Sequence, residues 1–253
     1  MIPYISSTVF YIGPIPFRTW GTLVAIGYLV GAYVAARRAR SKGLDEKAIW
    51  DLAFWLFIAA FVGARLFNVI FYQPMFYLAH PLAIIDPRQP GFAIEGGLIA
   101  CALVFWYYVK KKKLDFMAYA DTLIWGIPWG CGIGRIGCFL IHDHPGTLSN
   151  FVLAVKYPNG QVRNDLGLYL SLAGFIVGFI FLALDRKRHN PGFFFGMYIM
   201  LDSFTRIWLD FYRIADVTYL GLTPTQWVAI PLFFLGAWVV WSSEKQSKWG
   251  KAV

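Results

Sequence analysis

Long apolar runs alternate with short polar connections along the whole chain. Because lipid offers no partner to backbone N–H and C=O groups, an apolar run long enough to cross a bilayer, about 20 residues, forms a helix. Seven runs approach that length: 20–36, 49–72, 91–109, 117–141, 166–184, 191–212 and 225–242. The pattern predicts an all-α polytopic membrane protein with about seven transmembrane helices.

Lysine and arginine are divided unevenly between the connections. Fifteen of the 23 lie on one predicted side, in 37–48, 110–114, 185–190 and the C-terminal tail. The opposite side holds Arg18, Arg88, Lys156, Arg163 and Arg213. Cytoplasmic connections are the ones enriched in these residues, so we expect the N-terminus outside and the C-terminus in the cytoplasm. The lysine run 110–113 is then expected to lie against anionic lipid.

Composition supports a membrane location and argues against nucleic acid. The chain is 58% hydrophobic and 15% charged, whereas a soluble domain carries about 25% charged residues. A net charge of +9 could indicate nucleic-acid binding, but the positive residues adjoin apolar runs. No linker rich in Pro, Gly or Ser divides the chain, so a single integral membrane domain, 1–253, is predicted.

Two long connections on the outer side, 73–90 and 142–165, are predicted to be extracytoplasmic segments. In the second, "YPNGQ" indicates a turn between two short strands, "FVLAVKY" and "QVRND". His142 and His144, which flank Asp143, are expected to be ordinary loop residues, so no metal site is predicted. Any chemistry is expected on this outer side.

Three arginines, Arg65, Arg135 and Arg206, fall inside the apolar runs, in their outward halves. An arginine at the centre of a bilayer costs at least about 2.5–3.5 kcal/mol. Each alone could reach toward the outer headgroups or pair with an acid. Three at one depth favour an anionic site, and guanidinium binds phosphate in a bidentate manner. The phosphate present at that depth belongs to a phospholipid.

Acidic residues accompany these arginines. Asp202 and Asp210 each lie four residues from Arg206, so both can share its helix face and neutralise it. Glu95, beside Gly96 and Gly97 near the outer start of its run, is expected to be partly buried. Burial makes a carboxylate a better base, so Glu95 is a candidate general base.

The stretch "WGCGIGRIGCFL" contains the spacing Gly132-x-Gly134-x-x-Gly137, which resembles a dinucleotide-binding fingerprint. That fingerprint must follow a strand and open a helix in a βαβ unit. Here it lies near the end of an apolar run. The glycines are instead expected to allow close approach of helices around Arg135.

Several stretches, in order and spacing from about Trp20 to Trp241, resemble one known family. They are "GARLFNVIFYQPMFYLAHPLAI", "EGGLIA", "GIGRIGCFL", "FTRIWLDFYR" and "LTPTQWVAIPL". The family is prolipoprotein diacylglyceryl transferase. The resemblance implies an enzyme of the bacterial cytoplasmic (inner) membrane, with its active site toward the extracytoplasmic side. Such an enzyme moves the diacylglyceryl group of phosphatidylglycerol to the lipobox cysteine of a preprolipoprotein. Glycerol phosphate leaves, and no metal or organic cofactor is implied.

The resemblance also suggests roles for individual residues. Arg135 matches the arginine of the family's Gly-Arg-Ile-Gly motif, and Arg206 and Arg65 match arginines of the sixth and second spans. All three are therefore predicted to bind the lipid phosphate, with Arg135 and Arg206 also catalytic. Glu95 stands where the family has a histidine and is the third predicted catalytic residue.

Other positions depart from the family pattern. Cys138 replaces an asparagine, Asp143 stands at best for a glutamate, and Trp20 replaces a tyrosine. These three and Asp210 are predicted to support the site. Because the acceptor-handling groups have changed, two alternatives stay open. One is a related lipid-headgroup transferase with another donor or acceptor, and the other is a non-catalytic phospholipid-binding membrane protein.

Overall fold

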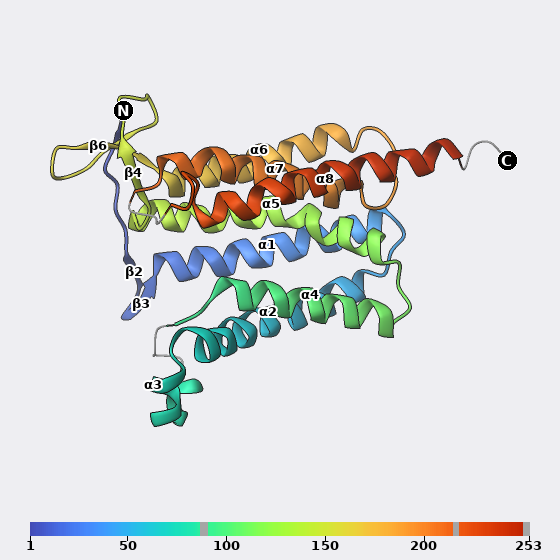
Figure 1. The fold of residues 1–253 in the computed structure, drawn as a ribbon, viewed down its shortest axis with the longest axis horizontal. Coiled ribbons are helices and arrows are strands. Elements are labelled where there is room, and N and C mark those ends of the chain that lie inside the picture. Colours follow the sequence, from blue (N-terminus) through green and yellow to red (C-terminus); the bar gives the residue numbers. More distant parts are fainter. Residues whose placement is uncertain (87–90, 215–217, 250–253) are drawn as a thin grey trace. The chain divides into compact units, whose positions relative to one another are not determined.

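The structure is a computed structural model that describes residues 1–86, 91–214 and 218–249 (Figure 1). Arg88 and Lys251, which entered the predicted charge distribution, lie outside the described residues, as do residues 87–90 of the predicted segment 73–90. The described chain forms two compact parts. One comprises residues 1–38 and 120–253, and the other residues 39–119.

A helix occupies each of the seven predicted runs. These helices are α1 (Thr19–Ser41), α2 (Glu46–Phe67), α4 (Ile94–Lys111), α5 (Phe116–Ile141), α6 (Leu166–Leu184), α7 (Phe193–Leu209) and α8 (Pro224–Trp249). Among the described residues, five stretches are long and apolar enough to cross a membrane: α1, α2 with its extension to Tyr72, α5, α6 and α8 as far as Lys245. The helical, multi-pass membrane architecture is thereby confirmed. The two helices outside this group are shorter, with 18 residues in α4 and 17 in α7.

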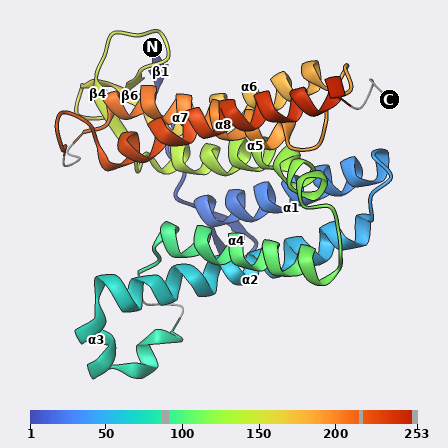
Figure 2. The same ribbon diagram turned by 45° about the vertical axis from the view of Figure 1, so that its right-hand side comes forward.

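The smaller part, residues 39–119, is built on the pair α2 and α4, which run side by side in both views (Figures 1 and 2). The pair is close because glycine faces glycine: a Cβ placed on Gly63 would lie 2.5 Å from the Gly96 carbonyl oxygen. Helix α2 continues through a π-helical turn, η1 (Asn68–Tyr72), into α3 (Pro74–Ala79) and the short 3-10 helix η2 (Pro81–Ile84).

The larger part packs its helices through the same small-residue contacts. A Cβ on Gly126 would meet the backbone of Gly31, and one on Gly196 would lie 2.9 Å from the Gly236 carbonyl oxygen, so α1 approaches α5 and α7 approaches α8. In the fingerprint-like stretch, a Cβ on Gly137 would lie 3.1 Å from the Trp20 Cα. The predicted use of these glycines for close helix approach is confirmed.

Short strands gather at the end of the larger part where α5 ends and α6 begins. The four-stranded sheet has the order β1 (Ile2–Pro3), β5 (Val155–Lys156), β6 (Val162–Asp165), β4 (Pro145–Leu148). Strands β5 and β6 form the predicted antiparallel hairpin, although only two residues of "FVLAVKY" are in the strand. A second hairpin, β2 (Val9–Ile12) with β3 (Ile15–Arg18), leads into α1.

Candidate functional site

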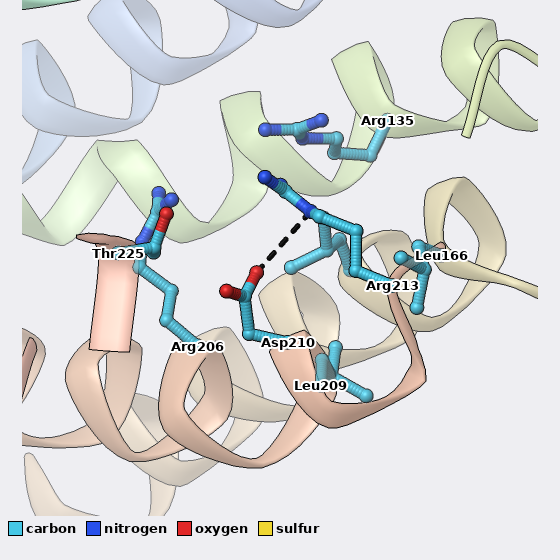
Figure 3. Close-up of a pocket in the computed structure, with 8 residues that line it drawn as sticks. Arg135, Leu166, Arg206, Leu209, Asp210, Arg213 and Thr225 are labelled. Atoms are coloured by element: carbon cyan, nitrogen blue, oxygen red, sulfur yellow. Dashed lines mark ion pairs between the residues drawn. The ribbon is translucent and has the colours of Figure 1, made fainter. Parts of the chain in front are cut away.

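Arg135 of α5 and Arg206 of α7 line one small cavity, together with Arg213 and Asp210 (Figure 3). Leu166 and Leu170 of α6, Leu209 of α7 and Thr225 of α8 complete its lining. Two of the arginines expected to converge therefore do so. Arg213, which follows the 3-10 turn η3 (Asp210–Tyr212), is the residue that the sequence analysis missed, because it had been assigned to an outer connection.

Arg135 differs from its neighbours in having no acidic partner in the described chain. Its Nη1 donates to the Sγ of Cys138 at 3.8 Å, a weak contact. Arg206, by contrast, donates from Nε to Asp202 Oδ2 at 2.6 Å. The guanidinium of Arg135 thus carries a charge that the described protein leaves without an ion pair.

Asp210 pairs with a different arginine from the one expected. Its Oδ1 lies 3.2 Å from Arg213 Nε (Figure 3). Its Oδ2 accepts a hydrogen bond from the Thr223 hydroxyl. The expectation that Asp202 and Asp210 both neutralise Arg206 is therefore wrong for Asp210. The reason is geometric: the helix tightens into η3 after Leu209, and the i to i+3 spacing then favours Arg213.

A second cavity shares Arg135, Leu170 and Arg206 with the first. Its remaining lining is largely apolar along α5 and α6, with Pro128, Ala173, Gly174 and Val177, while Cys131, Tyr198, Asp202 and Thr205 complete it. A cationic site therefore adjoins an apolar one. This arrangement suits a molecule with a phosphate headgroup and an apolar tail.

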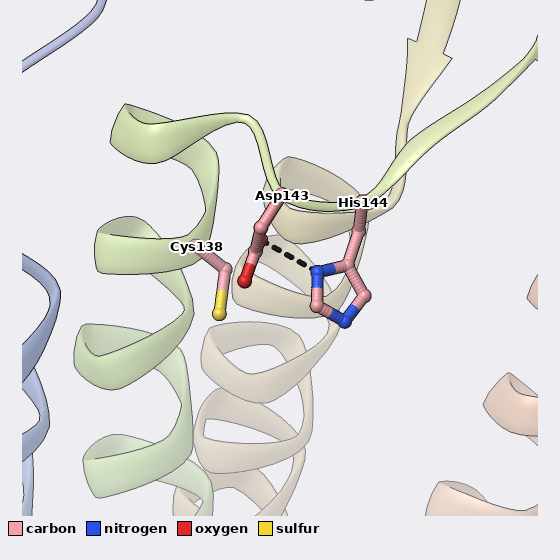
Figure 4. Close-up of side chains that lie close together, drawn as sticks. All are labelled: Cys138, Asp143 and His144. Atoms are coloured by element: carbon pink, nitrogen blue, oxygen red, sulfur yellow. Dashed lines mark ion pairs between the residues drawn. The ribbon is translucent and has the colours of Figure 1, made fainter. Parts of the chain in front are cut away.

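Three further side chains come together at the C-terminal end of α5 and in the loop that follows it. Cys138, Asp143 and His144 offer donor atoms that all lie within 4.8 Å of one another (Figure 4). Asp143 Oδ1 lies 2.5 Å from His144 Nδ1. Trp20, predicted to support the site, packs against this end of α5 at Gly137. Sequence reasoning had taken His144 for an ordinary loop residue, and the spacing of these three residues gave no indication of the cluster.

His142 is a structural residue of the same loop. Its Nδ1 lies 2.7 Å from Asp165 Oδ2 and its Nε2 lies 3.2 Å from the Ile5 carbonyl oxygen, while Tyr4 stacks on its ring. Burial and the Asp165 carboxylate raise the pKa of Tyr157, which keeps its hydroxyl protonated and donating to that carboxylate. This buried cluster ties the N-terminal segment to the end of α5.

In the smaller part, Arg65 is buried and organises a loop. Its Nε donates to the Ile84 carbonyl at 3.0 Å, and its Nη atoms donate to the carbonyls of Ala83, Asp86 and Gly91. These contacts hold η2, Asp86 and Gly91 against α2. The predicted role of Arg65 as a phosphate ligand stays a prediction.

Glu95 lies in the first turn of α4, and its side chain is exposed. Within its own compact part Glu95 lacks the partial burial expected for it, because the neighbouring Gly96 and Gly97, not Glu95, face α2. Its candidacy as a base now rests on its position within the resemblance.

Known proteins of one family resemble this chain over most of its length. Residues 7–242 match the family model described as prolipoprotein diacylglyceryl transferase. The chain belongs to this family. Among similar members, the phosphatidylglycerol–prolipoprotein diacylglyceryl transferase of Geobacter sulfurreducens is 29% identical, covering 92% of this chain and 94% of that protein. The proteins of the same name from Staphylococcus saprophyticus and Staphylococcus xylosus are 30% and 32% identical, covering 93% and 82% of this chain and 88% and 78% of their own lengths.

Family membership sets the altered positions in context. Arg135 and Arg206 of the cavity match the arginines of the resemblance to prolipoprotein diacylglyceryl transferase, whereas Cys138 and Asp143 depart from it. Both departures lie at the C-terminal end of α5 or just after it, where Cys138 contacts Arg135. A further departure, Glu95, lies in the other compact part.

Proposed function

We propose that the protein transfers the diacylglyceryl group of phosphatidylglycerol to the lipobox cysteine of a preprolipoprotein. It would do so in the bacterial cytoplasmic membrane, with the site toward the extracytoplasmic side. The proposal rests on Arg135. This residue lines a cavity together with Arg206, and its charge has no ion pair in the described chain.

The charge of the cavity suits a phosphodiester. The side chains of the two adjoining cavities include three guanidinium groups (Arg135, Arg206 and Arg213) and two carboxylates (Asp202 and Asp210). The three positive and two negative side chains together carry a net charge of +1. This charge matches the single negative charge of a phosphatidylglycerol headgroup. The apolar lining of the second cavity supports binding of the adjoining glycerol and acyl portion.

The proposed reaction makes the phosphate more negative, which the same arginines favour. The acceptor sulfur forms a bond with the glycerol carbon of the diacylglyceryl group, and the bond from that carbon to the phosphate oxygen breaks. Glycerol phosphate leaves as a monoester with about −1.5 to −2 charges at neutral pH. Fixed positive charge in a site of low dielectric stabilises such developing charge. The thiol proton passes to a base, for which Glu95 is the candidate.

Membrane topology belongs to the proposal. Seven spans with the N-terminus outside would place the cavity, the end of α5 and the β5–β6 hairpin outside. Support comes from the basic residues at the opposite ends of the helices in the larger part: Arg37 and Arg38 near the end of α1, and Arg186, Lys187 and Arg188 after α6.

The test is transfer by the purified protein in nanodiscs containing labelled phosphatidylglycerol and a lipobox peptide. We expect a thioether-linked peptide and free glycerol phosphate. Arg135→Ala should reduce transfer and weaken phosphatidylglycerol binding about 10- to 100-fold, because charged hydrogen bonds contribute about 1.5–3 kcal/mol. Arg37→Ala, which removes an exposed arginine of α1, is the matched control.

Two results would change the assignment. Lipid binding without product in the wild-type protein would favour a non-catalytic phospholipid-binding protein. Product from another anionic phospholipid, but none from phosphatidylglycerol, would favour a transferase with a different donor.

A further inference from the structure

We propose that Asp202 makes the arginine cavities prefer a singly charged phosphodiester over a doubly charged phosphate monoester. Asp202 does so by holding Arg206 and by keeping one negative charge beside the position of the phosphate. The preference concerns the phosphate group of any lipid that binds there, whereas its effect on product release rests on the proposed function.

Asp202 lies one helical turn before Arg206 on α7, and the two side chains form an ion pair. Arg206 donates from Nε to Asp202 Oδ2 at 2.6 Å. The Nη1 and Nη2 atoms of Arg206 form no hydrogen bond within the described residues. The carboxylate thus holds the guanidinium at Nε, and the two terminal nitrogens remain for two phosphate oxygens, the bidentate geometry that arginine favours.

The same carboxylate lines a cavity. Asp202 and Arg206 both border the second cavity, and Arg206 also borders the first, together with Arg135 and Arg213 (Figure 3). The side chains of Arg206 and Asp202 are 41% and 32% exposed, so their ion pair does not seal either from a ligand. A phosphate bound between Arg135 and Arg206 therefore has the negative charge of Asp202 close by.

The charge of the ligand then decides how well the cavities bind it. A phosphodiester brings one negative charge, which balances the net +1 of the charged side chains that line the two cavities. A phosphate monoester brings about −1.5 to −2 charges. Its second charge stays uncompensated beside apolar walls, where the loss of hydration is costly. Repulsion by the Asp202 carboxylate adds to this cost.

The other carboxylate, Asp210, is bound into the wall of the first cavity. It is 7% exposed, pairs with Arg213 and accepts a hydrogen bond from the Thr223 hydroxyl. Asp202, by contrast, has Arg206 as its one hydrogen-bond partner among the described residues. A substitution at Asp202 therefore changes the charge of the site without breaking a buried network.

The preference has a consequence for the release of product. In the proposed reaction a singly charged donor binds, and a glycerol phosphate with about −1.5 to −2 charges leaves. The three guanidinium groups of the cavities stabilise the charge as it develops. Asp202 weakens the binding of the finished product, because it repels the charge that the product has gained.

Competition between two lipids tests the preference. Phosphatidylmethanol and phosphatidic acid carry the same diacylglyceryl group, but the first is a phosphodiester and the second a monoester. Each is used to displace fluorescent phosphatidylglycerol from the protein in phosphatidylcholine nanodiscs at about pH 8, where the monoester carries nearly two charges. Asp202→Asn should raise the affinity for phosphatidic acid relative to phosphatidylmethanol by about 10-fold, since it removes one nearby negative charge.

Two further variants separate charge from structure. Asp202→Glu keeps the charge and should keep the wild-type ratio of the two affinities. Asp185→Asn is the matched control, because it removes the carboxylate of another arginine pair, Arg38–Asp185, outside both cavity linings. An ion pair as exposed as that of Asp202 adds little stability, and damage to the fold does not produce a gain in affinity. An unchanged ratio in Asp202→Asn, or an equal rise in Asp202→Glu, would overturn the proposal.

Transfer assays separate this inference from the proposed function. If the protein transfers diacylglyceryl groups, glycerol phosphate should inhibit Asp202→Asn at about 10-fold lower concentration than wild-type protein. A changed lipid ratio without any transfer would support the role of Asp202 and contradict the proposed function. Transfer with equal product inhibition in both proteins would leave the transferase intact and overturn the role of Asp202 in product release.

Discussion

At the scale of single residues, two arginines of similar sequence context have different surroundings. The guanidinium of Arg65 donates hydrogen bonds to backbone carbonyls of the loop that follows α2. The guanidinium of Arg135 makes one weak contact in the described chain, to the Cys138 sulfur. Both occur in outward halves of apolar runs, so the sequence predicted a shared role. What separates them is whether a loop folds back within reach, which depends on tertiary structure.

Glu95 gives the residue-scale prediction. Its side chain is exposed, so Glu95→Gln should fold normally. If Glu95 accepts the thiol proton, the substitution should lower kcat by about 10²- to 10⁴-fold and leave phosphatidylglycerol binding unchanged. Single-turnover transfer and lipid-binding titrations measure the two quantities.

Glu46→Gln is the matched control, because Glu46 is a carboxylate in the first turn of α2 in the same compact part. Equal turnover of Glu95→Gln and wild-type protein would remove Glu95 from the mechanism.

At the scale of elements, the positions of the helices were predictable from the sequence, but the ion pairs between side chains were not. Apolar runs fix where a helix lies because the membrane leaves few alternatives. The same pattern does not say that Asp210 pairs with Arg213, since this depends on the tightening of the chain at η3. Nor does it reveal the left-handed backbone conformation of His142 (φ +50°), just after α5, which costs a non-glycine residue free energy.

Helix α7 supplies the element-scale prediction. A side chain at Gly196 would meet the Gly236 carbonyl oxygen and the Val240 amide, so Gly196→Leu should separate α7 from α8. We expect a lower midpoint of thermal unfolding and weaker phosphatidylglycerol binding, since α7 carries Arg206 and Asp202.

Gly21→Leu is the control, because a Cβ placed on Gly21 has no neighbouring atom within 4 Å. A stability loss equal in the two variants would show that any added bulk is harmful and would contradict the packing argument.

At the scale of the whole molecule, orientation is the property that sequence addresses best. The distribution of lysine and arginine predicts which connections face the cytoplasm, whereas packing inside each compact part says nothing about sidedness. The site residues were only partly predictable: Arg135 and Arg206 were found, but Arg213 and the cluster with His144 depend on folded loops.

Orientation is tested with single cysteines introduced into a chain lacking Cys101, Cys131 and Cys138. An impermeant maleimide should label Asn159→Cys, in the β5–β6 hairpin, in intact cells. Lys187→Cys, after α6, should label only after permeabilisation, because its connection is predicted to be cytoplasmic. The opposite labelling pattern would invert the topology.

The isolated charge of Arg135 also bears on how the chain is assembled. During synthesis α5 is made before α7, so Arg135 enters the membrane before Asp202 and Arg206 exist. Burying that arginine costs at least about 2.5–3.5 kcal/mol, and no described carboxylate later pairs with it. An anionic lipid headgroup can offset this cost as soon as α5 inserts. The lipid that the enzyme would consume is thus also a counterion during its biogenesis.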